Sequence, residues 1–291
     1  MYEKIEHCPV CKTKKFENYL ITKDYMVSNE SFAIQKCEEC DFIFTNPRPN
    51  KEEISKYYES NKYISHTNKA INPIQLIYKL VRKYTLYKKG KLIYNYIKPN
   101  SLLDYGCGTG DFINYINKKN IKTIGIEPDK LASTISKNKG LSIYNTLEEI
   151  PEDQPFDVIT LWHVLEHIHQ LEDIIEKLKN LLSAKGIMIV ALPNYESYDA
   201  TYYKEYWAGW DVPRHLYHFS KKTLTKLFNS KKLKIKEIKP MIFDSYYVSL
   251  LSEGYKTNKT NPFKAFLTGH KSNKLAKQNN NYSSLIYIIQ K

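Results

Sequence analysis

Long apolar runs are what this sequence most clearly lacks. No stretch approaches the roughly 18 uninterrupted apolar residues of a membrane-spanning helix. Segment 1–20 is charged and contains no apolar core like that of a signal peptide, so we expect a cytoplasmic protein. Hydrophobic residues make up 42% of the chain and charged residues 26%, a balance typical of a globular protein.

Arginine is also scarce. Only Arg48, Arg82 and Arg214 occur, although the net charge is +13. Arginine is the favoured side chain for bidentate recognition of phosphates and bases. The lysine excess therefore favours a solvated surface, or attraction of an anionic small molecule such as a nucleotide-linked one, over a nucleic-acid surface. Nucleic-acid binding remains open as an alternative.

Cysteine is almost confined to the N-terminus. Four of the five cysteines form two C-x₂-C pairs, at Cys8 and Cys11 and at Cys37 and Cys40. Two such pairs close a tetrahedral Cys₄ site with no open position, which indicates structural Zn²⁺. A disulfide is disfavoured because thiols stay reduced in a cytoplasmic protein.

Strand and helix patterns alternate through the rest of the chain. The N-P-R-P-N turn at 46–50 marks a boundary, and a helical apolar pattern over 74–97 is stopped by Pro99. Helices are expected from about 111 and over 131–137, 171–182 and 221–228, the last capped by Ser220. Strands are expected over 101–105, 122–126, 141–144, 156–161, 187–192, 233–239 and 283–289.

This alternation predicts an α/β, Rossmann-like fold. We expect a seven-stranded, mostly parallel sheet with helices on both faces, preceded by a small Cys₄ zinc module. The expected domains are the zinc module at 1–50, a linker and helical region at 51–98, and an enzyme domain at 99–291. Segment 193–219 follows the end of a strand and is expected to form a lid on the substrate side.

A glycine-rich turn follows the first of these strands. Its sequence is D-Y-G-C-G-T-G at 104–110, with G-x-G-x-G spacing preceded by Asp104. A dinucleotide site would have G-x-G-x-x-G with a pyrophosphate at the helix N-terminus. S-adenosylmethionine has no phosphate and carries two positive groups, which an acidic side chain and bare carbonyls suit better.

A second acidic residue ends the next strand. Glu127, in G-I-E-P-D at 125–129, lies about 20 residues after the glycine turn, where a carboxylate accepts hydrogen bonds from ribose hydroxyls. The segment F-D-V-I-T-L-W-H-V-L-E-H follows at 156–167.

With these three segments, residues 100–240 resemble the class I S-adenosylmethionine-dependent methyltransferases, in particular the small-molecule, sugar and ubiquinone-type group. The resemblance implies a cofactor site near the glycine turn, the second strand end, and the ends of the third and fourth strands. Its predicted residues are Asp104, Gly106, Cys107, Gly108, Gly110, Glu127, Pro128, Thr146, Leu147, Trp162 and His163. Cys107 is assigned no redox role.

The H-x-x-E-H pattern formed by His163, Glu166 and His167 matches an inverted zinc-peptidase motif. Its place directly after a strand, within a methyltransferase order, argues against peptidase chemistry and favours packing beside the cofactor turn. The resemblance to quinone methyltransferases leaves a divalent ion at these side chains open.

The lid contains the candidates for substrate chemistry. Methyl transfer aligns a nucleophile and often removes its proton, a role that suits histidine. We expect His215 to be the base, with His218 as second candidate. Arg214 is expected to bind a substrate phosphate or carboxylate. Aromatic contacts to the acceptor are expected from Tyr206 and Trp210.

The sequence therefore predicts a methyltransferase acting on oxygen or carbon of a small molecule, foremost a sugar or nucleotide-sugar of a polysaccharide or secondary-metabolite pathway. The N-terminal cysteines resemble the zinc-binding region of certain sugar C-methyltransferases. Three alternatives remain: an RNA methyltransferase, since some ribosomal RNA methyltransferases carry such a module; a quinone-type O-methyltransferase; and a non-catalytic protein that binds S-adenosylmethionine and zinc. The oligomeric state is left open.

Overall fold

The computed structural model describes residues 1–58, 73–151 and 154–291, with the side chains of 73–80 left undescribed. The described residues divide into two compact units. Unit 1 comprises Met1–His66, Leu165–Glu172 and Ala191–Tyr287, and unit 2 comprises Thr67–Val164, Asp173–Val190 and Ile288–Lys291. Part of the predicted 51–98 linker, residues 59–72, lies outside the described residues.

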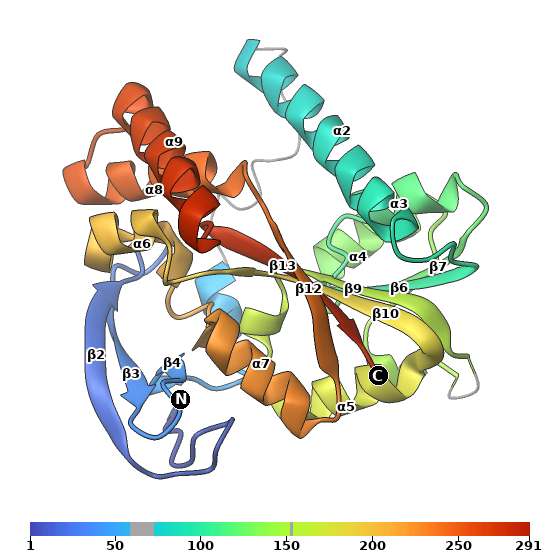
Figure 1. The fold of residues 1–291 in the computed structure, drawn as a ribbon, viewed down its shortest axis with the longest axis horizontal. Helices are drawn as coiled ribbons and strands as arrows, with labels where there is room; N and C mark the ends of the chain where they lie inside the picture. The colour runs from blue at the N-terminus through green and yellow to red at the C-terminus, as the bar shows by residue number, and fades with distance from the viewer. Residues whose placement is uncertain (59–72, 152–153) are drawn as a thin grey trace. The chain divides into compact units, whose positions relative to one another are not determined.

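A seven-stranded sheet forms the framework, with strand order β12-β13-β10-β9-β6-β7-β8 (Figure 1). β9, β6, β7 and β8 pair in parallel, which confirms the Rossmann-like α/β prediction. The strands are β6 Ser101–Tyr105, β7 Lys122–Ile126, β8 Ile143–Tyr144, β9 Phe156–Trp162, β10 Leu182–Pro193, β12 Lys234–Pro240 and β13 Ser284–Gln290.

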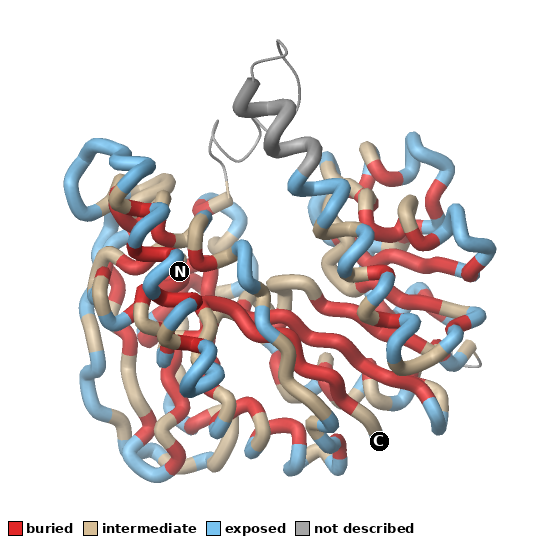
Figure 2. Tube along the Cα trace, turned by 45° about the horizontal axis from the view of Figure 1, so that its top comes forward, coloured by how far each residue is buried: buried red, intermediate tan, exposed pale blue. Residues whose placement is uncertain are grey.

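β9 and the second half of β10 are rich in apolar residues, as buried parallel strands require. Residues of β6, β9 and β10 are buried along most of each strand (Figure 2). The helices that follow the strands are α3 Asp111–Asn117, α4 Lys130–Lys137, α5 Leu171–Leu181 and α7 Lys221–Ser230. Ser220 caps α7 through a reciprocal pair of hydrogen bonds with Thr223, as predicted.

Unit 1 contains a second, four-stranded sheet in the order β11-β4-β3-β2 that the sequence did not predict. β4 pairs with β11, so the N-terminal region joins the predicted lid segment in one antiparallel sheet. The strands are β2 Phe16–Lys23, β3 Ser31–Cys37, β4 Ile43–Thr45 and β11 Tyr217–His218. A two-stranded pair is formed by β1 Tyr2–Glu3 and β5 Arg48–Pro49.

The remaining helices are mostly short. The predicted irregular segment 193–219 contains α6 Tyr198–Tyr203, η4 Lys204–Tyr206 and η5 Ala208–Trp210. The longer helices are α2 Pro73–Tyr94, α8 Asp244–Thr257 and α9 Pro262–Asn279. Single turns are η1 Ile54–Tyr58, η2 Leu147–Glu149 and η3 Leu165–His167. No helix among the described residues has the length and apolar content needed to cross a bilayer.

Candidate functional site

The glycine turn between β6 and α3 in unit 2 is open. Gly108 has φ +54°, and a Cβ atom added there would meet nothing within 4 Å. Gly106 has φ +74° and lies so close to Val164 that an added Cβ would fall 2.5 Å from its methyl carbon. Both positions favour glycine, the first with free space in front of it and the second through contact with the segment that follows β9.

Glu127 is tied to this turn. Its carboxylate accepts hydrogen bonds from the backbone N–H of Gly108 at 2.7 Å and of Asp129 at 2.9 Å. Burial raises the pKa of Glu127, although these two hydrogen bonds oppose the shift. A carboxylate offers about four acceptor positions, so it retains capacity for hydroxyl groups of a ligand.

Asp104 lies at the carboxyl end of β6, the strand next to β7, and is 2% exposed. Its Oδ1 accepts a hydrogen bond from the Thr160 hydroxyl of β9 at 2.5 Å. Burial raises the pKa of Asp104 to about 7, while Thr160 and the nearby Lys89 act in the opposite direction. A cationic ligand would favour the ionised form. Sequence reasoning missed Thr160, which was visible as a polar residue inside an apolar strand.

The other predicted cofactor residues lie along the same end of the parallel sheet. Cys107 packs under the turn, where an added Cβ on Gly125 would lie 2.6 Å from its sulfur. Gly110 caps α3, and Pro128 is exposed beside Glu127. Thr146 and Leu147 begin η2 directly after β8.

Trp162 ends β9, and His163 follows it directly. The Trp162 ring lies edge-on to Phe112 and has the Lys89 ammonium 4.2 Å from its centroid. Its Nε1 is buried and finds no acceptor among the residues the structure describes. His163 has φ +58°, a conformation that non-glycine residues adopt at a cost, as happens at ligand sites. Two buried carboxylates, an unsatisfied N–H and an open glycine turn fit a cationic nucleoside with free hydroxyls.

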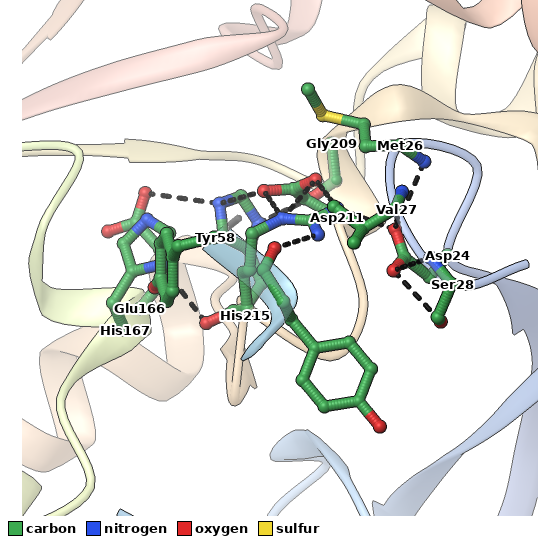
Figure 3. Close-up of polar contacts among 12 residues, drawn as sticks. Asp24, Met26, Val27, Ser28, Tyr58, Glu166, His167, Gly209, Asp211 and His215 are labelled. Atoms are coloured by element: carbon green, nitrogen blue, oxygen red, sulfur yellow. Dashed lines mark hydrogen bonds and ion pairs between the residues drawn. The ribbon is translucent and has the colours of Figure 1, made fainter. Parts of the chain in front are cut away.

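The histidines of the predicted lid belong to unit 1, and Figure 3 shows His215 with Glu166, His167 and Asp211. His215 Nδ1 lies 2.9 Å from the Gly209 carbonyl, so the Nδ1–H donates there and Nε2 carries the lone pair. Nε2 lies 3.9 Å from Glu166 Oε1 and 3.8 Å from Asp211 Oδ2. The His167 ring meets the His215 ring edge-on at 4.7 Å.

His167 is anchored from its other side. Its Nδ1 lies 2.9 Å from the Tyr58 hydroxyl and 3.0 Å from the Arg214 carbonyl. Burial, with His215 adding to it, lowers the pKa of His167 to about 4, so its ring is neutral at neutral pH. Sequence reasoning had given no role to Tyr58, whose position outside every motif left no signal.

The structure brings together ligand atoms of Glu166, His167 and His215 within 4.8 Å of one another. This set differs from the H-x-x-E-H pattern: His215 takes part, while His163 belongs to the other compact unit. Each imidazole is fixed through its Nδ1, an arrangement common for metal-binding histidines and for general bases.

Arg214, the predicted anion-binding residue of the lid, is enclosed by carboxylates. The Arg214 side chain is 2% exposed and forms ion pairs with Asp24 at 2.9 Å and Asp211 at 2.7 Å. Its NH1 also donates to the Tyr57 carbonyl at 2.7 Å. A substrate anion would have to compete with two carboxylates, so this geometry argues against the predicted anion-binding role and makes Arg214 a buried tie between the N-terminal segment and the lid.

Asp211 is the carboxylate that Arg214 and His215 share. Burial alone would raise the pKa of Asp211, but the net shift is downward because Arg214 and His215 lie next to it. Its φ of +36° is again a costly conformation for a non-glycine residue. Sequence reasoning placed Asp211 in the lid without assigning it a role, although its i,i+4 spacing to His215 was visible.

His218, the second predicted base, is 4% exposed. Its Nε2 lies 3.3 Å from the Thr45 hydroxyl, and its ring meets Trp210 edge-on at 5.0 Å. Burial lowers the pKa of His218 well below its usual value. This environment indicates that His218 packs in the interior of unit 1.

Tyr206 and Trp210, the predicted aromatic contacts, lie in η4 and η5 of the lid. The Tyr206 ring lies 5.9 Å from that of Tyr25. Trp210 donates its Nε1–H to the Lys204 carbonyl at 2.8 Å. A small hollow in unit 1 is lined by Thr22, Lys23, Tyr25, Met26, Trp207, Trp210, Asp211, Arg214 and Tyr255.

The four N-terminal cysteines converge as predicted. Cys8 and Cys40 Sγ lie 3.5 Å apart, and Cys11 and Cys37 Sγ lie 3.4 Å apart, too far for disulfides. A tetrahedral Zn²⁺ site with 2.3 Å bonds has sulfurs about 3.8 Å apart.

The two C-x₂-C turns, at Cys8–Cys11 and Cys37–Cys40, also have the same backbone hydrogen bond. The Cys8 carbonyl accepts from Lys12 N at 2.9 Å, and the Cys37 carbonyl accepts from Asp41 N at 3.0 Å. Both donors, Lys12 and Asp41, have positive φ. The donor set and the repeated turn fit a structural Zn²⁺.

A parallel sheet with a glycine turn and acidic strand ends defines a Rossmann-like enzyme class. Comparison with known proteins gives the family: residues 81–237 match the family described as "Methyltransferase domain". That match covers more than half of the chain, which therefore belongs to this family. The predicted class, the Rossmann-like S-adenosylmethionine-dependent methyltransferases, is confirmed.

Individual relatives are more distant. The chain is 27% identical over 188 residues to a ubiquinone biosynthesis O-methyltransferase of Rickettsia felis, covering 60% of this chain and 74% of that protein. It is 26% identical over 221 residues to the enzyme of the same name from Rickettsia bellii, covering 67% and 86%.

Two solved structures share the fold. One is the magnesium protoporphyrin IX methyltransferase from Synechocystis with bound S-adenosylhomocysteine, at TM-score 0.53 and 12% identity, covering 83% of this chain and all of that one. The other is an O-methyltransferase of a Brevibacillus brevis polyketide synthase with S-adenosylhomocysteine, at TM-score 0.50 and 17% identity, covering 76% and 77%.

Proposed function

We propose that the chain transfers a methyl group from S-adenosylmethionine to a hydroxyl oxygen of a small acceptor related to ubiquinone precursors. The observation that carries the cofactor assignment is the pair of buried carboxylates, Asp104 and Glu127, on neighbouring parallel strands around the open Gly108 turn. Asp104 supplies negative charge for the methionine end of the cofactor, and Glu127 accepts from the ribose.

The acceptor assignment rests on relatives. The curated relatives named above are O-methyltransferases of ubiquinone biosynthesis, and they favour a quinone-type acceptor over the sugar or nucleotide-sugar that the sequence put first. The commitment of Arg214 to Asp24 and Asp211 also removes the side chain expected to hold a nucleotide phosphate.

His215 is the proposed general base. Its Nε2 has the lone pair, since Nδ1–H donates to Gly209, and Asp211 and Glu166 would stabilise the imidazolium formed on taking the acceptor proton. The same atoms favour a second role: Glu166, His167 and His215 are spaced to bind a divalent cation, which would lower the pKa of an acceptor hydroxyl.

The test is a methyl-transfer assay with labelled S-adenosylmethionine against four acceptor classes: a ubiquinone-precursor phenol, nucleotide-sugars, free sugars and RNA. We expect turnover with the phenol. Turnover only with a nucleotide-sugar or RNA would replace the acceptor assignment, and calorimetry showing no affinity for S-adenosylmethionine would contradict the cofactor site.

Substitution of His215 tests the base. We expect His215→Asn to lower kcat by roughly 100-fold or more while the affinity for S-adenosylmethionine stays within about twofold. His218→Asn is the matched control. It should lower the thermal midpoint and leave kcat nearly unchanged. If the metal-free protein is active only after Mg²⁺ or Mn²⁺ is added, the cation role is favoured. An unchanged kcat in His215→Asn would exclude both the base role and the cation role.

A further inference from the structure

The C-terminal helices α8 and α9 pack with an inverted polarity. The buried face of α9 consists of small and polar residues: Ala265, Thr268, Gly269, Ser272, Asn273 and Ala276. Its exposed face begins with large apolar side chains, since Phe263, Phe266 and Leu267 are 73%, 56% and 50% exposed. An ordinary surface helix has the opposite arrangement.

Close packing explains the small inner residues. A Cβ added to Gly269 would lie 2.9 Å from the backbone oxygen of Ser245, so the two helices, side by side in Figure 1, approach almost backbone to backbone. The inner face of α8 is likewise made of Ser245, Ser249, Ser252 and Glu253. The contact between α8 and α9 is therefore made without the large apolar side chains of the two helices.

The exposed apolar side chains extend across both helices. Phe266 stacks on Tyr246 of α8 with ring centroids 5.2 Å apart. The Asn273 side chain of α9 donates to the Ile242 carbonyl at 2.9 Å, which fixes the start of α8 against α9. We define the α8–α9 apolar surface as the exposed residues Ile242, Phe243, Tyr247, Phe263, Phe266 and Leu267.

The α9 part of this surface, Phe263, Phe266 and Leu267, lies in a segment without negative charge, whereas its α8 part has Asp244 and Glu253 in the same segment. No Asp or Glu occurs after Glu253, whereas the lysines there are Lys256, Lys259, Lys264, Lys271, Lys274, Lys277 and Lys291. Lys264 is paired with Glu253 at 2.7 Å. The exposed stripe of α9 continues at helical spacing from Leu267 through His270 and Lys271 to Lys274 and Lys277, all exposed.

We propose that the α8–α9 apolar surface docks the protein onto the anionic surface of a membrane. Phenylalanine and leucine side chains would enter the boundary between headgroups and acyl chains, and the lysines beside them would contact lipid phosphates. Contact is peripheral, because no described helix is suited to cross a bilayer. This docking is independent of the acceptor proposed above.

Other occupants fit less well. A second copy of the chain meeting this surface about a two-fold axis would bring the lysine rows of both copies together, which costs binding energy. RNA would pair with the lysines, but it would leave the aliphatic Leu267 and Ile242 without apolar contact.

The test is co-sedimentation of the full-length protein with vesicles of phosphatidylcholine alone and with added phosphatidylglycerol. We expect binding only to the anionic vesicles. The double variant Phe263→Gln/Leu267→Gln should bind at least about tenfold more weakly, and Lys274→Glu/Lys277→Glu should both weaken binding and reduce its salt dependence.

Matched controls keep the test specific. Ile21→Gln removes an exposed apolar side chain of β2, 65% exposed, and Lys14→Glu/Lys118→Glu makes the same change in net charge at exposed sites elsewhere. Both should bind like the native protein, and every variant should keep its thermal midpoint. Absence of binding to anionic vesicles overturns the proposal. Light scattering that shows a dimer of the native protein and a monomer of Phe263→Gln/Leu267→Gln also overturns it. So does binding to RNA that the same variants weaken, without binding to anionic vesicles.

Discussion

At the scale of single residues, burial decides the chemistry of the cofactor site. Asp104 is enclosed beneath the glycine turn and is held by Thr160, so its carboxyl group is costly to ionise without a positive partner. Its raised pKa of about 7 makes it responsive in the physiological range.

We predict that affinity for S-adenosylmethionine rises with pH through the Asp104 titration. Below a pKa of about 7 the folded, ligand-free protein holds Asp104 protonated, and the cationic ligand must displace that proton. Calorimetry between about pH 6 and about pH 8, in buffers of different ionisation enthalpy, should show proton release on binding, and Asp104→Asn should abolish it.

The same shift affects stability with a defined sign. Between the unfolded pKa of about 4 and the folded value, the folded state binds the extra proton, so the free energy of unfolding falls as pH rises. Asp104→Asn should flatten this part of the profile. Affinity independent of pH, with no proton released, would show that Asp104 does not face the ligand.

Two glycines allow conformational strain to be separated from ligand contact. Gly108 and Gly140 both have positive φ, and an added Cβ at either would meet nothing within 4 Å. We predict that Gly108→Ala and Gly140→Ala each cost about 1 kcal/mol of stability, since the backbone penalty is similar. Only Gly108→Ala should also weaken S-adenosylmethionine binding, by roughly tenfold or more by calorimetry. Equal affinities in the two variants would place the cofactor elsewhere.

At the scale of elements, sequence patterns predicted the strands that are buried on both faces. β6, β7 and β9 were predicted to within about a residue, because short segments containing apolar residues, bounded by turns and alternating with helical patterns, have few other solutions. β2 has the burial pattern of a mostly exposed strand and gave no such signal. α8 and α9 were missed because their inner residues are small and polar, which reverses the expected pattern.

The two C-x₂-C turns are elements that the cysteine spacing alone predicted, and their zinc stays a prediction. We expect elemental analysis of the native protein to find about one Zn²⁺ per chain. Cys11→Ser should lose the metal and lower the thermal midpoint, because metal binding contributes folding free energy. Cys107→Ser, at the half-buried cysteine of the glycine turn, should keep its zinc. A native protein without zinc, whose midpoint is unaffected by Cys11→Ser, would rule the module out.

At the scale of the whole molecule, the sequence predicted the enzyme class, and the acceptor stays a proposal. The expected domains were consecutive segments, whereas unit 1 combines residues from the N-terminus, from η3 and from the C-terminal third. Pairing between β4 and β11, and the ion pair of Asp24 with Arg214, depend on contacts far apart in the chain that local patterns do not encode. His215 is predicted as the base from its residue type, whereas its neighbours Glu166 and Asp211 are identified only by the geometry.

The strand order β12-β13-β10 has a consequence for synthesis on the ribosome. β13 is translated after both of its neighbours, β10 and β12, yet it lies between them in the sheet. Until residues 284–290 leave the exit tunnel, the nascent chain cannot complete its sheet, and the apolar β10 keeps an open edge. Such an edge pairs readily with other chains, so the interval before translation of β13 is when this protein is most exposed to aggregation and most dependent on chaperones.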